Sequence, residues 1–72
     1  MTEQNVKKIR VELGNKLRNA REKLNLTQAE VADHAGITKN YYSRIERGTE
    51  NPSFETLQAI MRVVKIKSIG LL

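Results

Sequence analysis

The stretch TQAEVADHAGITKNYYSRIERG, residues 27–48, carries helix start and end signals at short spacing. Thr27 and Glu30 have the spacing of a capping box, in which each side chain accepts a hydrogen bond from the other residue's backbone N–H. Gly36 stands where a helix commonly ends in a left-handed residue, a conformation that glycine adopts without strain. The pattern predicts a helix over residues 28–35 that ends in a tight glycine turn.

A second helix follows this turn. Thr38 is a favourable N-cap residue and Gly48 repeats the glycine ending, so we expect a helix over residues 39–47. Ala32 is small and lies where two steeply crossing helices would come closest. Two short capped helices, a glycine turn and a small residue at the crossing are typical of a helix-turn-helix unit, which we expect over residues 28–47.

The second of these helices has two chemically different faces when its residues are placed 100° apart. One face has no acid on it and holds Lys39, Asn40, Ser43, Arg44 and Arg47. The other face is apolar; it places Tyr42 and Ile45 in the core and Tyr41 at the border. Lys and Arg can donate to guanine, and Asn can pair with adenine, in the major groove of DNA. A solvated polar face is the ordinary alternative, but the caps, the turn and the lack of acid together favour nucleic-acid recognition.

The charge distribution also favours nucleic-acid recognition. The formal net charge is +5, which favours a polyanionic partner, with nucleic acid first and an anionic membrane surface second. Residues 1–24 hold seven Lys or Arg against three Glu, whereas residues 25–48 hold three of each sign. The acids of the middle segment lie off the basic face of the second helix, so this neutral segment still presents positive charge on one side.

Helical periodicity continues on both flanks of the unit. An apolar stripe predicts a long first helix: Val6, Ile9, Leu13, Leu17, Ala20 and Leu24. Gly14 interrupts the stripe, so we expect the helix proper to begin near it, with residues 1–8 as a loose extension. Ser53 caps a fourth helix, whose expected buried stripe is Phe54, Leu57, Ile60, Met61 and Val64. No segment alternates with period two, so the sequence predicts one all-α domain over residues 1–72, with a last short turn after Ser68.

Composition and motifs exclude several classes of protein. The 72 residues leave no room for a deep cleft beside a core, and without cysteine there are no disulfides or thiolate metal sites. No apolar run approaches the roughly 18 residues of a membrane span. Asp33, His34 and Ser43 are the residue types of a catalytic triad without its arrangement, and His34 has no second metal ligand at useful spacing. We expect a cytoplasmic binding protein that is not an enzyme and needs no cofactor, metal or small-molecule ligand.

The run LRNAREKLNLTQAEVADHAGITKNYYSRIERGTENPSFETLQAI, residues 17–60, resembles the Cro/lambda-repressor-type helix-turn-helix family, also called XRE-like. The shared marks are L-R-x-x-R, T-Q-x-E-V-A, A-G-I-T, S-R-I-E-R-G and N-P-S-x-x-T-L, in that order. The resemblance covers about residues 12–66. It implies a compact five-helix, lambda-repressor-like domain that binds double-stranded DNA as a transcription regulator, such as a phage repressor or a restriction–modification controller.

The resemblance also implies roles for single residues. Base contacts are expected from Lys39, Asn40, Ser43 and Arg44. Phosphate contacts are expected from Gln28, Thr38, Tyr41 and Arg47. The resemblance makes the helix over residues 39–47 the recognition helix, and a buried ion pair between Arg21 and Glu46 would account for the one acid in it.

Two questions about partners stay open at this stage. Proteins of this family often dimerise through their last segment, and the tail here is apolar enough for burial against a second subunit through Val64, Ile66, Ile69, Leu71 and Leu72. Packing of that tail onto the chain's own core is the alternative. We expect a homodimer on a pseudo-palindromic operator. A different possibility is an antitoxin-type module that masks a partner protein, although this sequence offers little extra surface for a toxin.

Overall fold

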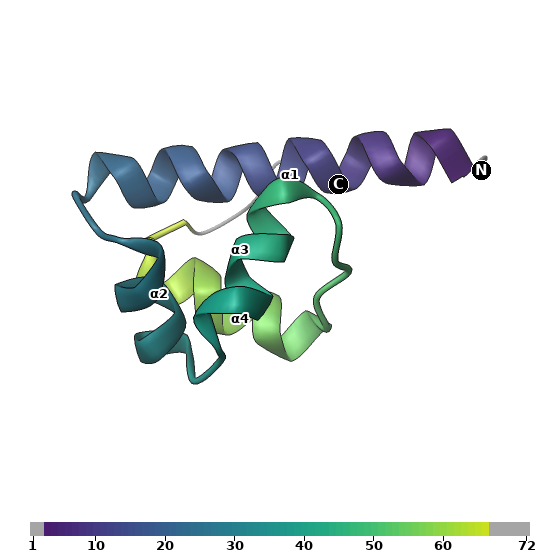
Figure 1. Cartoon of the computed structure of the whole chain (residues 1–72). Helices are drawn as coiled ribbons and strands as arrows, with labels where there is room; N and C mark the ends of the chain where they lie inside the picture. Colours follow the sequence, from purple (N-terminus) through teal and green to yellow (C-terminus); the bar gives the residue numbers. More distant parts are fainter. Residues whose placement is uncertain (1–2, 67–72) are drawn as a thin grey trace.

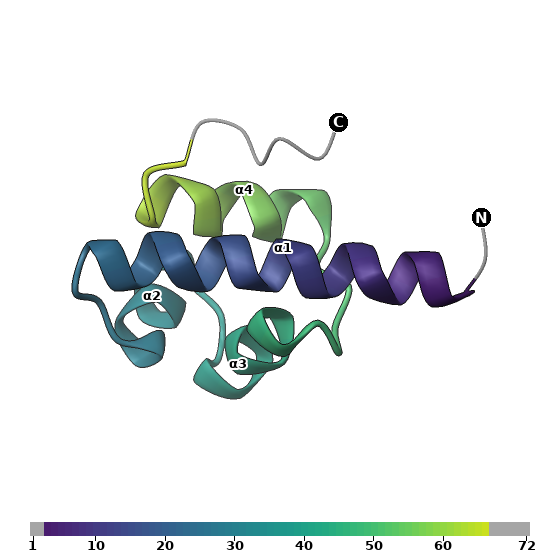
Figure 2. The same ribbon diagram turned by 90° about the horizontal axis from the view of Figure 1, so that it is seen from above.

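The computed structural model describes residues 3–66, which form four helices and no strand. The helices are α1 (Glu3–Lys23), α2 (Gln28–Ala35), α3 (Lys39–Arg47) and α4 (Phe54–Val63). Figure 1 shows α1 along one side of the molecule with the three shorter helices beneath it. Seen from above, α4 lies on one side of α1, and α2 and α3 lie on the other (Figure 2). The all-α class is confirmed, and no helix in the described range is long and apolar enough to span a membrane.

The core lies between α1 and the shorter helices. Its buried apolar side chains are Leu13, Leu17, Val31, Ala32, Tyr42, Ile45, Ile60 and Val64. Residues of all four helices belong to this set. In agreement with this, α1 contacts α3, and α2 contacts both α3 and α4. A core shared by all four helices fixes α3 in place, which matters for the exposed face of that helix.

The helix-turn-helix unit has the bounds that the capping signals predicted. Thr27 accepts a hydrogen bond from the backbone N–H of Glu30 at 3.0 Å, and the Glu30 carboxylate accepts from the Thr27 N–H at 2.8 Å. Gly36 and Gly48 end α2 and α3 in the left-handed conformation, with φ of 75° and 79°. These two helices therefore begin and end where the local capping residues mark them.

The expected start of the first helix near Gly14 is wrong, because α1 continues through this glycine back to Glu3. A Cβ atom at Gly14 would lie 2.7 Å from the carbonyl oxygen of Ile45 and closer still to that of Glu46. Gly14 thus lets α1 and the end of α3 approach closely. Residues 3–8, expected to be a loose extension, belong to α1.

The expected burial of Phe54 is also wrong, since its side chain is 70% exposed. Phe54 is the first residue of α4 and lies about 120° around the helix from the buried Ile60. Ser53 caps the helix as predicted, with its hydroxyl accepting from the Thr56 N–H at 3.1 Å. The buried stripe of α4 therefore begins one turn later than the apolar pattern suggested.

The chain leaves α4 through Lys65, which has a positive φ of 61°, and the Ile66 N–H donates to the carbonyl of Met61 at 2.9 Å. Val64 is 3% exposed and belongs to the core of its own chain, so it is not free to contact a second subunit as expected. Ile66 packs against the same core and is half-buried. The expected short turn after Ser68, and with it any fifth helix, lies outside the described residues, as do Ile69, Leu71 and Leu72.

Candidate nucleic-acid interface

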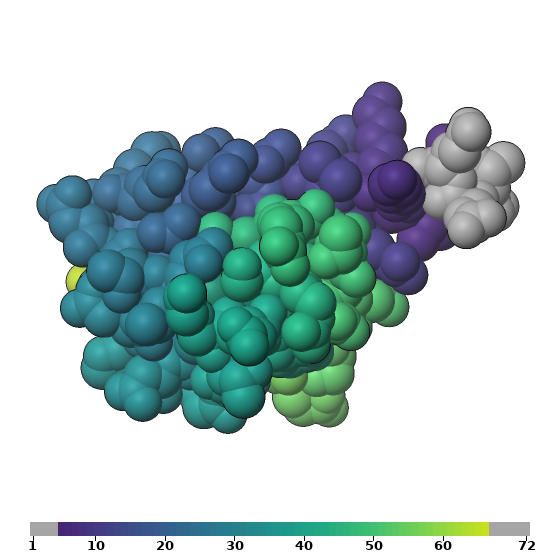
Figure 3. All heavy atoms as spheres, viewed as in Figure 1, coloured from purple at the N-terminus to yellow at the C-terminus, as the bar shows by residue number. Residues whose placement is uncertain are grey.

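The outward face of α3 gathers the residues expected to contact bases. Lys39, Asn40, Arg44 and Arg47 are exposed and Ser43 is half-buried, whereas Tyr42, Ile45 and Glu46 on the opposite face are buried. Figure 3 shows this side of the molecule, with the teal and green atoms of α3 at the centre. The helix therefore presents a basic and polar surface while its other side is held in the core.

A buried ion pair holds α3 against α1. Arg21 Nε lies 2.7 Å from Glu46 Oε2 and Arg21 Nη2 lies 3.1 Å from Glu46 Oε1, a two-point contact between planar groups. The side chains are only 12% and 2% exposed, respectively. Arg21 Nη1 also donates to the carbonyl oxygen of Leu26 at 2.9 Å, which ties the pair to the α1–α2 loop.

The electrostatics of this pair favour its charged form. Burial by itself raises the pKa of the Glu46 carboxyl, but the interactions that stabilise the carboxylate, with the hydrogen bond from Arg21 first among them, outweigh it, and the net pKa is lowered. The hydrogen bond to Glu46 likewise raises the pKa of Arg21. Both groups thus stay ionised inside the fold.

Gln28 has a role that the sequence did not predict. Its side-chain nitrogen donates to Glu46 Oε1 at 2.9 Å, so the first residue of α2 is joined to α3. Because 18 residues separate the two in sequence, no local spacing signals this bond. The expected contact between Gln28 and phosphate stays a prediction. The side-chain amide that would make this contact already donates a hydrogen bond to Glu46.

Tyr42 lies next to the ion pair at the centre of the core. Its hydroxyl oxygen is buried and has no hydrogen-bond partner among residues 3–66. Burial, followed by the neighbouring Glu46 carboxylate, raises the pKa of Tyr42, so the phenol stays neutral. Tyr42 thus contributes apolar area to the core, in agreement with its expected place.

Arg44 is held by an acid from outside the helix. Its Nε lies 3.0 Å from Glu50 Oε2, and both side chains are partly exposed. Glu50 lies in the loop after the C-cap of α3, where helical periodicity no longer predicts which residues are in contact. The sequence therefore did not predict Glu50 as the partner of Arg44. Since Nε alone makes the contact, the two terminal nitrogens of the guanidinium remain for an external acceptor.

The remaining residues expected to contact phosphate lie at the start and edge of α3. The Thr38 hydroxyl accepts from the Tyr41 N–H at 3.1 Å and is exposed. Tyr41 is half-buried against the core, at the border where the sequence placed it. The first N–H groups of a helix have no intrahelical partner, so this end of α3 favours an anion.

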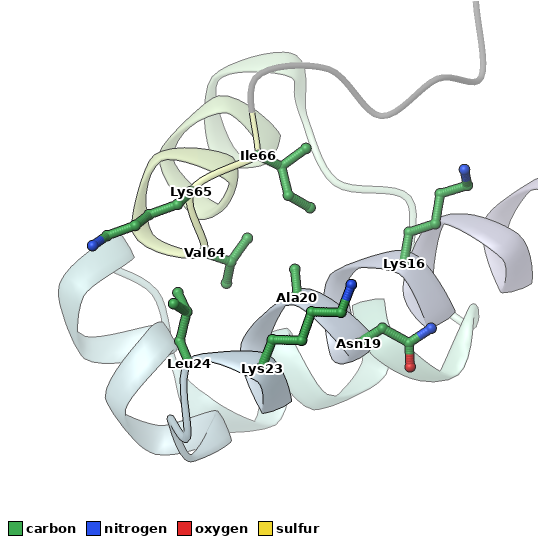
Figure 4. Close-up of a pocket in the computed structure, with 8 residues that line it drawn as sticks. All are labelled: Lys16, Asn19, Ala20, Lys23, Leu24, Val64, Lys65 and Ile66. Atoms are coloured by element: carbon green, nitrogen blue, oxygen red, sulfur yellow. The ribbon is translucent and has the colours of Figure 1, made fainter.

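A groove of about 500 Å³ lies on another side of the molecule, between α1 and the end of α4 (Figure 4). Its lining residues are Lys16, Asn19, Ala20, Lys23, Leu24, Val64, Lys65 and Ile66. Apolar side chains form its floor and lysines its rim, and no residue of α2 or α3 takes part. It is therefore separate from the outward face of α3.

The sequence matches a known protein family. The sequence model of the family described as Helix-turn-helix (HTH_3) matches residues 17–71. The chain belongs to this family. The resemblance noted from its motifs is thereby confirmed.

Relatives of the helix-turn-helix chain are regulators and repressors by name. The transcriptional regulator ClgR of Mycobacterium tuberculosis strain H37Rv is 40% identical over 58 residues, which are 81% of this chain and 52% of that protein. The immunity repressor protein of Bacillus phage phi105 is 33% identical over 55 residues, which are 76% of this chain and 38% of that protein. The chain thus spans about half the length, or less, of these curated relatives.

Solved structures share the fold. The restriction–modification controller protein C.AhdI of Aeromonas hydrophila matches with a TM-score of 0.76 and 28% identity, over 79% of this chain and 86% of that one. The clp gene regulator ClgR of Corynebacterium glutamicum matches with a TM-score of 0.78 and 30% identity, over 83% of this chain and 63% of that one. The helix-turn-helix chain therefore has the fold of these two regulators.

Proposed function

We propose that this chain is a sequence-specific, double-stranded DNA-binding transcription regulator that places α3 in the major groove. The observation that carries the proposal is the outward face of α3, which is exposed and holds Lys39, Arg44 and Arg47 without an acid of the helix itself, while the other side of the helix is buried. The relatives named as regulators and repressors support it. Such a protein acts in the cytoplasm as a binding module, not as an enzyme.

The proposed contacts divide between bases and backbone. Lys39 and Asn40 in the first turn of α3 reach deepest into the groove, and Arg44 one turn later donates its two terminal nitrogens to a guanine. The phosphates are bound by Gln28, Thr38, Tyr41 and Arg47. Phosphate contacts set the register on the duplex, whereas contacts to base edges give the sequence preference.

The proposed assembly is a homodimer on a pseudo-palindromic operator. Two-fold pairs of such units bind half-sites about one helical turn apart. Since Val64 is buried in its own chain, the contact is assigned to Ile66 and to the apolar residues that follow it in the sequence, Ile69, Leu71 and Leu72. The names of the relatives favour this regulator over the antitoxin-type alternative.

A substitution at Arg44 tests base recognition. Arg44→Ala should relax the sequence preference at one base position in each half-site, at a cost of about 1–3 kcal/mol in discrimination. Arg47→Ala removes the same charge from the same helix and is the matched control; it should weaken all duplexes alike. Competition binding with single-base operator variants measures both. An equal loss on every sequence for Arg44→Ala would show that this residue contacts only phosphate.

A further inference from the structure

The N-terminal half of α1 lies beside the loop that follows α3. Because α1 continues through Gly14, its first residues extend past the close contact between α1 and α3. A Cβ atom at Gly48 would lie 2.7 to 2.9 Å from atoms of Val11, so the end of α3 touches α1 directly. In Figure 3 the purple atoms of α1 flank the green end of α3 on the viewer's side.

A recess of about 430 Å³ lies at this junction. It is lined by Val6, Lys7, Arg10, Gly48 and Thr49. Two of the five are cations, none is an acid, and the loop residues come directly after α3. Among residues 5–66, whose side chains the structure describes, neither cation has a salt-bridge partner.

Helix geometry directs these two cations toward α3. Lys7, Arg10 and Gly14 follow one another at steps of three and four, which places them on one side of α1. Gly14 is the residue that packs on α3, so Lys7 and Arg10 share its side. Lys8 points away from it, and Lys16 lines the separate groove beside α4.

We propose that Lys7 and Arg10 form a second phosphate-binding site on the same DNA duplex that α3 contacts. The inference rests on the proposed function and adds a site on α1 that the recognition helix does not include. The ligand is a backbone phosphate beside the one proposed for Arg47, the last residue of α3. Lysine supplies a compact positive charge and arginine a planar pair of donors, which together suit a phosphate oxygen cluster.

The dimensions agree with this placement. Lys7 lies seven residues from Gly14, or about 10 Å along α1 at 1.5 Å per residue. The major groove is about 12 Å wide. Lys7 and Arg10 therefore stand about 10 and 6 Å along α1 from its contact with α3, within one groove width of that contact.

Salt dependence of binding tests the site, because each phosphate contact releases counterions. The double variant Lys7→Ala/Arg10→Ala should lower the slope of log affinity against log salt by about 2, and weaken binding at low salt on the order of tenfold. The loss should be equal for a mixed-sequence duplex and for any preferred duplex. Fluorescence anisotropy over a salt series, with the full chain and both duplexes, measures it.

Two matched variants complete the experiment. Lys8→Ala/Lys16→Ala removes the same charge from the other sides of α1 and should keep the wild-type slope. Lys7→Arg/Arg10→Lys keeps both charges in place and should also keep it. Circular dichroism of each variant shows that α1 is folded.

Two outcomes would overturn the proposal. If Lys7→Ala/Arg10→Ala keeps the wild-type slope, the two cations bind no phosphate. If Lys8→Ala/Lys16→Ala loses as much, only net charge matters and there is no site. Failure of the proposed function is separate, since it would appear as a flat salt dependence of the unsubstituted protein.

Discussion

At the scale of single residues, the Glu46 carboxylate joins three helices. It belongs to α3 and accepts hydrogen bonds from Arg21 of α1 and Gln28 of α2. Burial of a carboxylate costs free energy of folding unless its oxygens accept hydrogen bonds. Here Oε2 accepts from Arg21, and Oε1 accepts from both Arg21 and Gln28. The orientation of α3 therefore depends on polar contacts on the side opposite its exposed basic face.

Removal of Arg21 leaves that carboxylate buried without its main partner. Arg21→Ala should lower the free energy of unfolding by about 3–5 kcal/mol, a large part of the stability of a domain this small. Arg18→Ala, on the exposed side of α1, should change it by less than about 0.5 kcal/mol. Urea unfolding of both variants checks the difference. Similar losses from the two would mean that the ion pair contributes nothing specific.

The lowered pKa of Glu46 gives the pair a defined pH dependence. Because the folded-state pKa lies below the ordinary value of 4.5, the stabilisation is complete above about pH 4.5 and is lost as the pH falls through the folded-state value. Glu46→Gln cannot titrate, so the difference in unfolding free energy between wild type and this variant should shrink in acid. Urea unfolding from neutral to acidic pH measures the difference. A gap that stays constant would contradict the assigned pKa direction.

The roles of single residues could be predicted where a local sequence pattern or the family resemblance indicated them. The basic side of α3 follows from helical periodicity, and the pairing of Arg21 with Glu46 came from the family resemblance. The bond from Gln28 to Glu46 and the contact between Arg44 and Glu50 were not foreseen. Both join residues across a change of direction in the chain, where no fixed spacing relates sequence to contact.

At the scale of elements, capping determines α2 and α3 while packing determines α1. Helix ends marked by threonine and glycine were placed correctly because their chemistry is local. Gly14 was interpreted only as a cost to helix propensity, whereas it allows the backbone of α3 to approach. A close contact between distant segments leaves no periodic signal, so the sequence alone could not reveal it.

A substitution at Gly14 separates these two effects. In an isolated helix, Gly→Ala stabilises by about 1 kcal/mol. Here the added methyl would meet the carbonyl oxygens of Ile45 and Glu46, so Gly14→Ala should instead destabilise the fold by about 1–3 kcal/mol. Asn19→Ala, at an exposed site of the same helix, is the control and should be neutral or stabilising. A rise in melting temperature for Gly14→Ala would contradict the close approach of α1 and α3.

At the scale of the whole molecule, the fold determines which of the basic residues lie close together. The net charge of +5 was known from composition, and its concentration in residues 1–24 from sequence. Only the fold shows that part of this charge, on α1, lies beside the end of α3, while another part borders the groove near α4. Long-range packing decides which lysines can act together, which is why composition predicted a polyanionic partner but not its position.

Selection of bound duplexes from a random DNA pool tests the central claim most directly. The pool is incubated with the full chain, and the bound fraction is recovered and sequenced over several rounds. A sequence-specific regulator with α3 in the major groove should enrich a two-fold symmetric motif whose half-sites lie about one helical turn apart. Recovery of duplexes with no enriched sequence, at any salt concentration, would contradict it.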